Sequence, residues 1–376
     1  MQCLSGTPIE QHQLCHRLTH YHQIYIHYWV INTMDVHELE EADRKTPTVL
    51  LECLYDSVDE NAVDTLDPDT VIDRINNTTL PSPVESLAAE YDDRIGIRNE
   101  FVWKWIYELF PYCTLDTVSE ELFEATRTRK TLFTMFITIL DDIAEVNHDR
   151  TTFRQARKIP FPDETVTTDG VDSASVSMAR NVWDELRREI HDAPRADEFT
   201  ELFRYDTRQS INSIDYSRLL IEQPETATRS GAIHYGPHNM VVFPYIGIDL
   251  MASPTFERSD LAPLRELLWK IQRLARIGNW VSTWEREIRE GDFSSGVVVW
   301  ALRDGIVEPE DLRERPESAI EAIRHSEVET ELMDRWISSY EELTDNELTA
   351  ASVDLDELLE GMKMVMIYHL ISEGYK

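Results

Sequence analysis

Three acidic side chains stand at the end of one apolar helical pattern. The segment Thr131–Val146 (TLFTMFITILDDIAEV) is mostly apolar until it reaches Asp141, Asp142 and Glu145. Residues three or four apart share one face of an α-helix, so these carboxylates can meet in one patch. Like charges at the end of an apolar stripe destabilise a fold unless a cation lies between them. Such hard oxygen ligands suit Mg²⁺, which readily shares its coordination shell with phosphate groups.

A second set of oxygen-bearing side chains follows much later in the chain. Gly278–Glu290 (GNWVSTWEREIRE) places Asn279, Thr283 and Glu287 at successive four-residue spacings. Their amide, hydroxyl and carboxylate oxygens lie in line on one helical face and can bind a further hard cation. Arg286 stands beside the last of them, where a guanidinium can hold a phosphate. Either set alone also fits an ordinary solvated helix face in so acidic a chain, but the two together favour a metal site.

Both sets lie in a chain whose pattern is helical almost throughout. Glycine is scarce, at 12 of 376 residues, and strands do not recur at the regular spacing of a sandwich or a parallel sheet. We expect an all-α protein with one main domain. Ser259 is the expected N-cap of the helix that starts at Asp260, and Gly236-Pro237 should kink or break its helix. The expected helices cover residues 100–112, 122–146, 172–191, 197–221, 232–251, 260–290, 318–343 and 354–371.

Composition divides the chain into three parts. Residues 1–33 hold one acidic and one basic side chain, and they form an atypical extension, disordered or translated from upstream of a true start at Met34. Residues 34–98 are acidic and turn-rich and should pack on the core, while residues 99–376 should form the single helical domain. A helical histidine ladder in the extension is a less favoured metal site. Five of the twelve histidines lie there: His12, His16, His20, His22 and His27.

The charge balance excludes several classes of partner. The formal net charge is −35, and only seven of the 36 basic residues are lysine, which predicts a protein from a halophilic archaeon. Such a chain cannot neutralise phosphates in bulk, so we expect neither a nucleic-acid partner nor docking on an anionic membrane. No apolar run approaches the roughly 20 residues of a membrane span, so a soluble, cytoplasmic protein is expected. The cysteines are too few for a disulfide framework: Cys3, Cys15, Cys53 and Cys113.

Taken as a pair, the two metal motifs resemble those of class I terpene synthases. In that family a DDxx(D/E) motif faces an N-D-x-x-(S/T)-x-x-x-E motif across a helical barrel. The likeness spans about Arg98 to the C-terminus, and it implies a class I isoprenoid-synthase-like helical bundle or barrel around a central apolar cavity. The residues that match the two motifs are Asp141, Asp142, Glu145, Asn279, Thr283 and Glu287.

The resemblance also implies a reaction. Three Mg²⁺ ions, with Mn²⁺ as an alternative, would hold the diphosphate of a linear prenyl diphosphate, farnesyl or geranylgeranyl, and promote its ionisation and cyclisation. Asp141, Asn279, Thr283 and Glu287 would be the catalytic ligands. Diphosphate would also be bound by Arg286 and Arg229. Aromatic candidates for the cavity wall, which are equally suited to plain core packing, are Trp103, Phe133, Phe136, Phe243, Tyr245, Trp280 and Trp284.

This chain departs from the family pattern at three points. Trp280 stands where the second motif usually has Asp, the residues around Arg229 are unfamiliar, and a C-terminal Arg-Tyr pair is missing. A chain-elongating prenyltransferase and a squalene- or phytoene-synthase-like condensing enzyme remain alternatives with the same fold and metals. A catalytically decayed helical homologue is a further alternative, and a homodimer is left open. Motifs for nucleotide, flavin or haem are missing.

Overall fold

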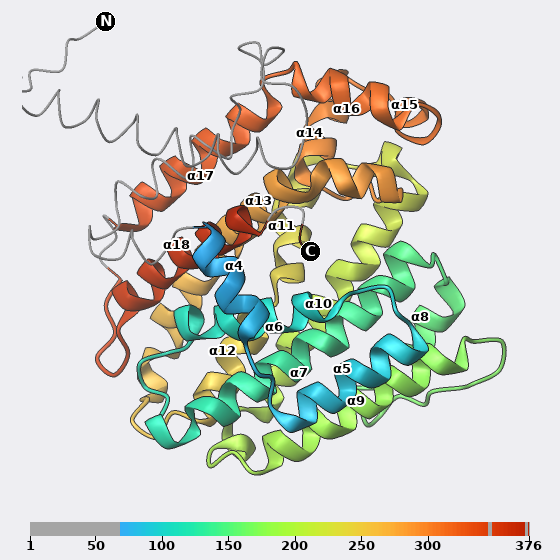
Figure 1. The fold of residues 1–376 in the computed structure, drawn as a ribbon. Coiled ribbons are helices and arrows are strands. Elements are labelled where there is room, and N and C mark those ends of the chain that lie inside the picture. The colour runs from blue at the N-terminus through green and yellow to red at the C-terminus, as the bar shows by residue number, and fades with distance from the viewer. Residues whose placement is uncertain (1–67, 345–347, 373–374, 376) are drawn as a thin grey trace, which may run out of the picture. The chain divides into compact units, whose positions relative to one another are not determined.

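The computed structural model describes residues 68–344, 348–372 and 375, and every regular element in these ranges is helical (Figure 1). The all-α class predicted from the sequence is therefore confirmed for the described part of the chain. The interpretation of residues 1–33, with their five histidines, and most of the acidic segment 34–98 fall outside it. The longer helices are α4 (Pro68–Asn77), α5 (Ser82–Arg94), α6 (Glu100–Leu109), α7 (Phe123–Asp141), α8 (Arg150–Ala156), α9 (Ser173–His191), α10 (Ala196–Glu222), α11 (Arg229–Tyr235), α12 (Val242–Met251), α13 (Leu261–Glu290), α14 (Gly296–Arg303), α15 (Pro309–Glu314), α16 (Pro316–Arg324), α17 (Val328–Thr344) and α18 (Leu355–Ile371).

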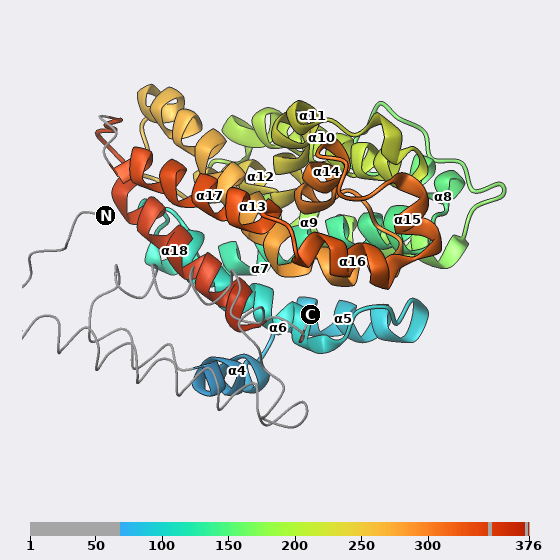
Figure 2. The same cartoon turned by 90° about the horizontal axis from the view of Figure 1, so that it is seen from above.

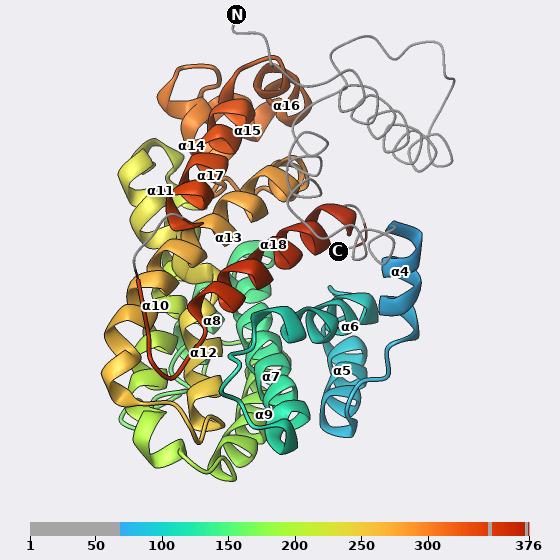
Figure 3. The ribbon, with the colours of Figure 1, turned by 90° about the vertical axis from the view of Figure 1, so that its left-hand side faces the viewer.

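Two long helices, α7 and α13, form the centre of the arrangement. Helix α7 packs along α9 and also contacts α5, α6, α10 and α12. Helix α13 packs against α17 and α18, and α18 crosses beside it in Figures 1 and 3. Seen from above, α4, α5 and α6 lie on the side of α7 away from α10 and α11 (Figure 2). These contacts carry the two predicted metal motifs into the middle of the helix assembly.

Helix α7 shows why a polar sequence can still be buried. Its apolar residues, including Leu132, Phe136 and Ile139, are fully buried, as the helical periodicity predicts. Between them, four threonines are also inaccessible or nearly so, and each hydroxyl donates to the carbonyl one turn earlier, as Thr134 does to Lys130 at 2.8 Å. The helix backbone therefore satisfies these four hydroxyls without solvent.

The break predicted at Gly236-Pro237 is present. Helix α11 ends at Tyr235, a tight 3₁₀ turn η7 (Gly236–Met240) follows, and α12 starts at Val242. Ser213 of α10 donates to the carbonyl of Tyr235 at 2.8 Å, which replaces a helical bond that the interruption removes. Val241 adopts φ +50° and ψ +22°, a left-handed conformation that is strained for a β-branched residue.

The helix prediction omits α8, α14 and α15, and two of its details are wrong. Ser259 does not cap α13, because Asp260 directly precedes the helix and its carboxylate accepts the backbone N–H groups of Ala351 and Ser352. The single helix expected at 318–343 is divided into α16 and α17. Ser326 lies in the gap, where its hydroxyl donates to the carbonyl of Ile323 at 2.6 Å and so competes with continued helical bonding.

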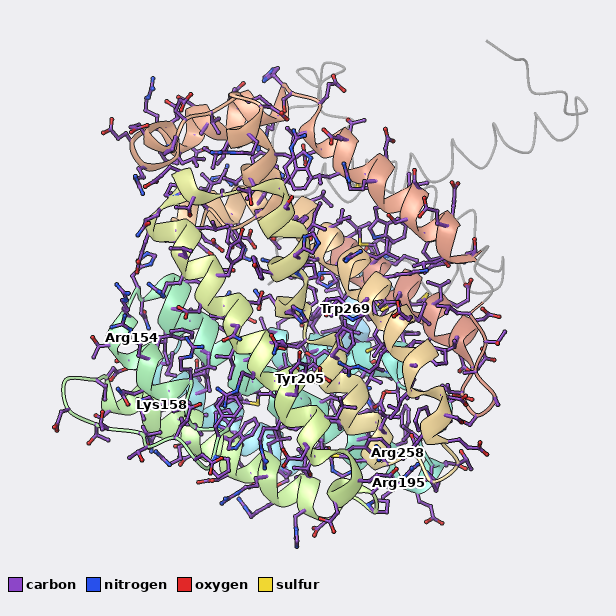
Figure 4. All side chains as sticks on the ribbon, turned by 180° about the vertical axis from the view of Figure 1, so that it is seen from behind. Arg154, Lys158, Arg195, Tyr205, Arg258 and Trp269 are labelled. Carbon is purple, nitrogen blue, oxygen red and sulfur yellow. The ribbon has the colours of Figure 1, made fainter. Side chains whose placement is uncertain are left out.

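The described surface carries large apolar side chains only singly. From behind, Tyr205 on α10 and Trp269 on α13 lie apart at the surface (Figure 4), and they are 59% and 37% exposed. Trp269 also packs edge-on against His238 and Phe243. Isolated exposed aromatics of this kind need no docking partner. A membrane span would need a longer and more apolar helix than any in the described residues.

Candidate metal centre

The two oxygen-rich motifs come together at one end of α7 and α13. Asp141 ends α7 and Glu145 follows it, while Glu287 lies near the end of α13. Glu145 and Glu287 line one small polar pocket and are close enough that the charge of Glu287 acts on Glu145. Side chains 142 residues apart in sequence thus share one site. The whole pocket is lined by Arg98, Glu145, Val146, Arg286, Glu287, Glu290 and Asp292.

The first motif lies in a π-helical turn, η5 (Asp142–Val146), and not in the regular α-helix from which the motif was interpreted. The backbone N–H of Asn147 donates to the carbonyl of Asp142 at 2.8 Å, five residues back. A π-turn widens the helix, and such turns are frequent at functional sites. In this turn one carboxylate oxygen each of Asp141 and Glu145 is buried without a hydrogen-bond partner. The wide turn therefore aims two acids inward without satisfying them.

Asp142 takes a different direction from its two neighbours in the motif. Its carboxylate is 1% exposed, accepts a hydrogen bond from the hydroxyl of Tyr91 at 2.7 Å and forms an ion pair with Arg98 at 2.8 Å. Arg98 precedes α6, just after the left-handed turn at Gly96. In this conformation Asp142 is paired with Arg98, and its predicted role as a metal ligand stays a prediction.

Four acids meet at the site: Asp292 is buried, and Asp141, Glu145 and Glu287 are half-buried. Burial raises the pKa of Asp141 to about 8, and the charge of Asp142 adds to that rise. Burial likewise raises the pKa of Glu287 to about 7, with the charge of Asp292 adding to it. The pKa of Glu145 is raised well above its ordinary value by burial and by Asp141. Such shifts in a cluster are typical of a site built to receive a cation or a proton.

Arg276 is the buried cation that faces this cluster, and the sequence interpretation missed it. The side chain is 6% exposed, and its Nη1 donates to Oδ1 of Asn279 at 2.7 Å. Its charge lowers the pKa of Asp141, Glu145 and Glu287. The available signal was its position three residues before Asn279, on the same face of the helix. The sequence interpretation also missed Asp292, which lies just after α13. In this case the sequence offered no signal, because no helical spacing relates Asp292 to the motif.

The other predicted ligands of α13 lie in line as expected. The hydroxyl of Thr283 donates to the backbone carbonyl of Asn279 at 2.6 Å, and it lies close enough to Glu287 to lower the pKa of that acid. Arg286 lines the polar pocket and pairs with Glu290 at 2.9 Å. The amide, hydroxyl and carboxylate oxygens therefore border the acid cluster, with a guanidinium at its rim.

Arg229, the other predicted diphosphate ligand, makes its contacts elsewhere. It is the first residue of α11, and its Nη2 donates to Oδ2 of Asp304, after α14, at 2.6 Å. Its guanidinium also lies over the ring of Trp300, 5.3 Å from the centroid. In this conformation Arg229 fastens α11 to α14, and its predicted contact with diphosphate stays a prediction.

The aromatic residues expected around a cavity are buried, except for the half-buried Tyr245, and all but Trp284 pack on other rings. The buried indole of Trp284 instead donates to Oε1 of Glu329 at 3.0 Å. Phe133 of α7 lies 6.1 Å from Tyr245 of α12, and Phe136 lies 4.8 Å from Trp183. Tyr245 is close enough to the acid cluster that the charge of Asp141 contributes to its raised pKa. A central cavity stays a prediction. The remaining candidates contact rings as follows: Trp103 with Tyr91, Phe243 with Trp269, and Trp280 with Trp300.

Trp280, the departure from the family motif, occupies a slot between two glycines. A Cβ added at Gly296 would lie 2.2 Å from the Trp280 ring, and one added at Gly236 would lie 3.4 Å from it. The indole therefore packs between η7 and the start of α14. A ring enclosed in this way acts as a packing element, and Asn279 beside it is left to face the acids.

The donor set fits Mg²⁺ in its chemistry. All the candidate ligands are hard oxygens, and two buried carboxylate oxygens, on Asp141 and Glu145, lack any partner. In the described ranges no three His, Cys, Asp or Glu side chains already form a metal-binding group. Mg²⁺ usually keeps several waters and uses only one or two carboxylates, so a completed protein cage is not required.

Sequence comparisons provide no family for this chain. No protein-family model matches it, and no curated protein matches it significantly.

Proposed function

We propose that the protein is a class I terpene synthase, which uses Mg²⁺ to ionise a linear prenyl diphosphate of 15 or 20 carbons and cyclises the resulting cation. One observation carries the proposal: Asp141 and Glu145, each with one buried carboxylate oxygen that has no hydrogen-bond partner, lie in one acid cluster with Glu287 of a distant helix. Burying like charges is costly unless a cation joins them, and a structural role would be served better by apolar residues. The resemblance of both motifs to the family supplies the substrate class.

The residues of the chain divide the work. Asp141 and Glu145 on one side, and Asn279, Thr283 and Glu287 on the other, would hold the metal ions; when bound, Mg²⁺ neutralises the charge that develops on the departing diphosphate. Arg286, already at the rim of the polar pocket, would donate hydrogen bonds to diphosphate oxygens after leaving Glu290. Arg229 would act similarly only if it leaves Asp304.

The hydrocarbon chain would lie among the rings between α7 and α12. Phe133 and Tyr245 face each other edge to face there, and Tyr245 is fixed by a 2.7 Å hydrogen bond to Thr134. Tyr245 lies close enough to Asp141 for the charge of that acid to act on it, so a cation formed near the metals would lie close to an aromatic ring. Phe133 is buried and Tyr245 is half-buried, which limits the access of water that would otherwise quench the cation.

The test is direct incubation with substrates. Purified protein in concentrated salt receives Mg²⁺ and prenyl diphosphates of 10, 15 or 20 carbons, and the organic extract is analysed for products. We expect a cyclic hydrocarbon or alcohol from the C15 or C20 substrate, lost in Asn279→Ala and retained in Asp92→Asn, a control at an exposed acid of α5.

The same incubation separates the alternatives. A longer diphosphate formed when isopentenyl diphosphate is added would indicate a chain-elongating prenyltransferase. A product joining two substrate molecules would indicate a squalene- or phytoene-synthase-like enzyme. If no substrate is consumed while the folded wild-type protein binds no Mg²⁺, the proposed function is wrong and the decayed homologue is favoured.

A further inference from the structure

Arg276 is placed where a metal ion is expected. Its Nη1 holds Oδ1 of Asn279 at 2.7 Å, so the guanidinium occupies the very oxygen that would bind an ion. The side chain is 6% exposed, and its Nε has no hydrogen-bond partner. The guanidinium of arginine has five N–H donors, so a buried arginine that uses only some of them can still donate to another acceptor.

The surroundings explain why this cation is needed before any metal arrives. The charge of Arg276 acts on Asp141, Glu145, Glu287 and Asp292 together. Without it, these four acids, one buried and three half-buried, would face each other with only Arg98 and Arg286 nearby, and Arg98 is engaged by Asp142. One fixed cation among four acids holds the cluster together but leaves it well short of neutral.

The contacts of Arg276 also show where it can go. A Cβ at Gly236 would lie 3.8 Å from Nε, so the free side of the guanidinium adjoins the interrupted helix at η7. Gln272, one turn earlier on α13, is 1% exposed and likewise has an amide nitrogen without a partner. Two unpartnered N–H donors on one face of α13 thus await an acceptor rich in oxygen.

We propose that Arg276 is a built-in counter-cation that gives up Asn279 to the incoming metal and then donates to the diphosphate. This inference rests on the proposed function and assigns a role to a residue outside both motifs. In the metal-free protein the guanidinium supplies one positive charge to the acids and shields Asn279. Metal binding displaces the guanidinium from Oδ1 of Asn279. The metal ions then balance the charge of the acids, so the guanidinium is free to donate hydrogen bonds to a diphosphate oxygen.

The proposal predicts opposite changes in two affinities. Arg276→Met removes a competitor for Asn279 and a like charge for the metal, so Mg²⁺ should bind at least about threefold more tightly. Inorganic pyrophosphate at saturating Mg²⁺ should bind roughly tenfold or more weakly, because charge-assisted hydrogen bonds are lost. Both are measured by calorimetric titration, with Arg273→Met, an exposed arginine one turn earlier on α13, as the matched control.

Each outcome decides the matter. Opposite changes in Arg276→Met with an unchanged control support the proposal. Weaker binding of both ligands means that Arg276 only holds the site in shape, and overturns it. If the wild-type protein binds neither Mg²⁺ nor pyrophosphate, both the proposed function and this inference are wrong. If the wild-type protein binds both ligands but Arg276→Met does not show the opposite changes in affinity, only this inference is wrong.

A second variant covers the case in which Arg276→Met does not fold, which circular dichroism would reveal. Arg276→Lys keeps the positive charge among the acids but lacks the planar fork. It should bind Mg²⁺ within about twofold of wild type and pyrophosphate at least about fivefold more weakly. Unchanged pyrophosphate affinity in this variant would overturn the proposal.

Discussion

Helix α7 carries two charged sites that differ in how they are satisfied. At Lys130 the ammonium is fully buried and donates to the carbonyl of Cys113, to Thr114 and to the buried carboxylate of Asp249, all within 3.0 Å. At Asp141, at the end of the same helix, acids outnumber the cations around them. One oxygen each of Asp141 and Glu145 is buried without a hydrogen-bond partner. The first site has the balance of a structural ion pair, and the second has the deficit of a binding site.

The comparison teaches how to tell the two kinds apart. Both involve buried carboxylates whose pKa is raised by burial, to about 6 for Asp249 and about 8 for Asp141. The direction of the pKa shift therefore does not distinguish them. An oxygen without a hydrogen bond does not distinguish them either, because Oδ1 of Asp249 also has none. What distinguishes them is direct contact with a cation: Oδ1 of Asp249 lies 2.6 Å from Nζ of Lys130, whereas no ion pair joins Asp141 or Glu145 to another described residue.

The largest expected effect is on the structural pair. Lys130→Met should lower the free energy of unfolding by about 3–5 kcal/mol, because it leaves the Asp249 carboxylate buried with no cation. Urea unfolding in concentrated salt measures the change, and Lys270→Met on α13 is the control. A loss below about 1 kcal/mol would remove the contrast between the two sites.

The next effect is catalytic. Asp141→Asn should lower turnover of the prenyl diphosphate by about 10²–10³-fold, since a ligand that stabilises the leaving group is lost. Stability above about pH 8, where Asp141 carries its charge, should hold or rise, because the substitution removes a charge that burial disfavours. Product formation and urea unfolding are measured on the same preparation. A variant that unfolds easily but turns over normally when folded would reverse our assignment.

Asp142→Asn tests whether adjacent residues of one motif belong to different sites. Because Asp142 is held by Arg98 and Tyr91, the substitution should cost about 1.5–3 kcal/mol of stability while reducing turnover less than Asp141→Asn does. Equal catalytic losses in the two variants would show that Asp142 leaves Arg98 to bind metal during the reaction.

The smallest effect concerns pH. With pKa values of about 8 for Asp141 and about 7 for Glu287, the folded protein binds more protons than the unfolded chain from about pH 4 upward to those values. Stability of the metal-free protein must therefore fall as pH rises through this window. A double variant, Asp141→Asn with Glu287→Gln, should lose about 2–4 °C less in Tm between pH 5.5 and 8.5 than wild type does.

Saturating Mg²⁺ should likewise reduce the loss of Tm that the wild-type protein shows between pH 5.5 and 8.5, because Mg²⁺ binds the deprotonated acids and opposes their repulsion. Scanning calorimetry in buffers of equal salt measures both. An identical pH slope in wild type and the double variant would mean that these carboxylates already titrate at ordinary pKa values.

Local periodicity accounts for what the sequence predicted well. Asn279, Thr283 and Glu287 are in line because helical spacing alone puts them there, and Gly236-Pro237 interrupts its helix because proline lacks an N–H wherever it stands. The division at Ser326 and the π-turn after Asp141 escaped prediction, because each depends on hydrogen bonds that compete with the α-helix by a small margin.

By itself, then, the sequence determined which stretches are helical and which oxygen-bearing side chains share a helical face, since both follow from contacts within a few residues. Only the tertiary structure decided which acids lack partners. Arg98 reaches Asp142 from before α6, and Asp292 joins Asp141 from beyond α13, although no spacing in the chain relates either pair. Burial and Coulomb interactions depend on distance in space, and packing between helices sets that distance.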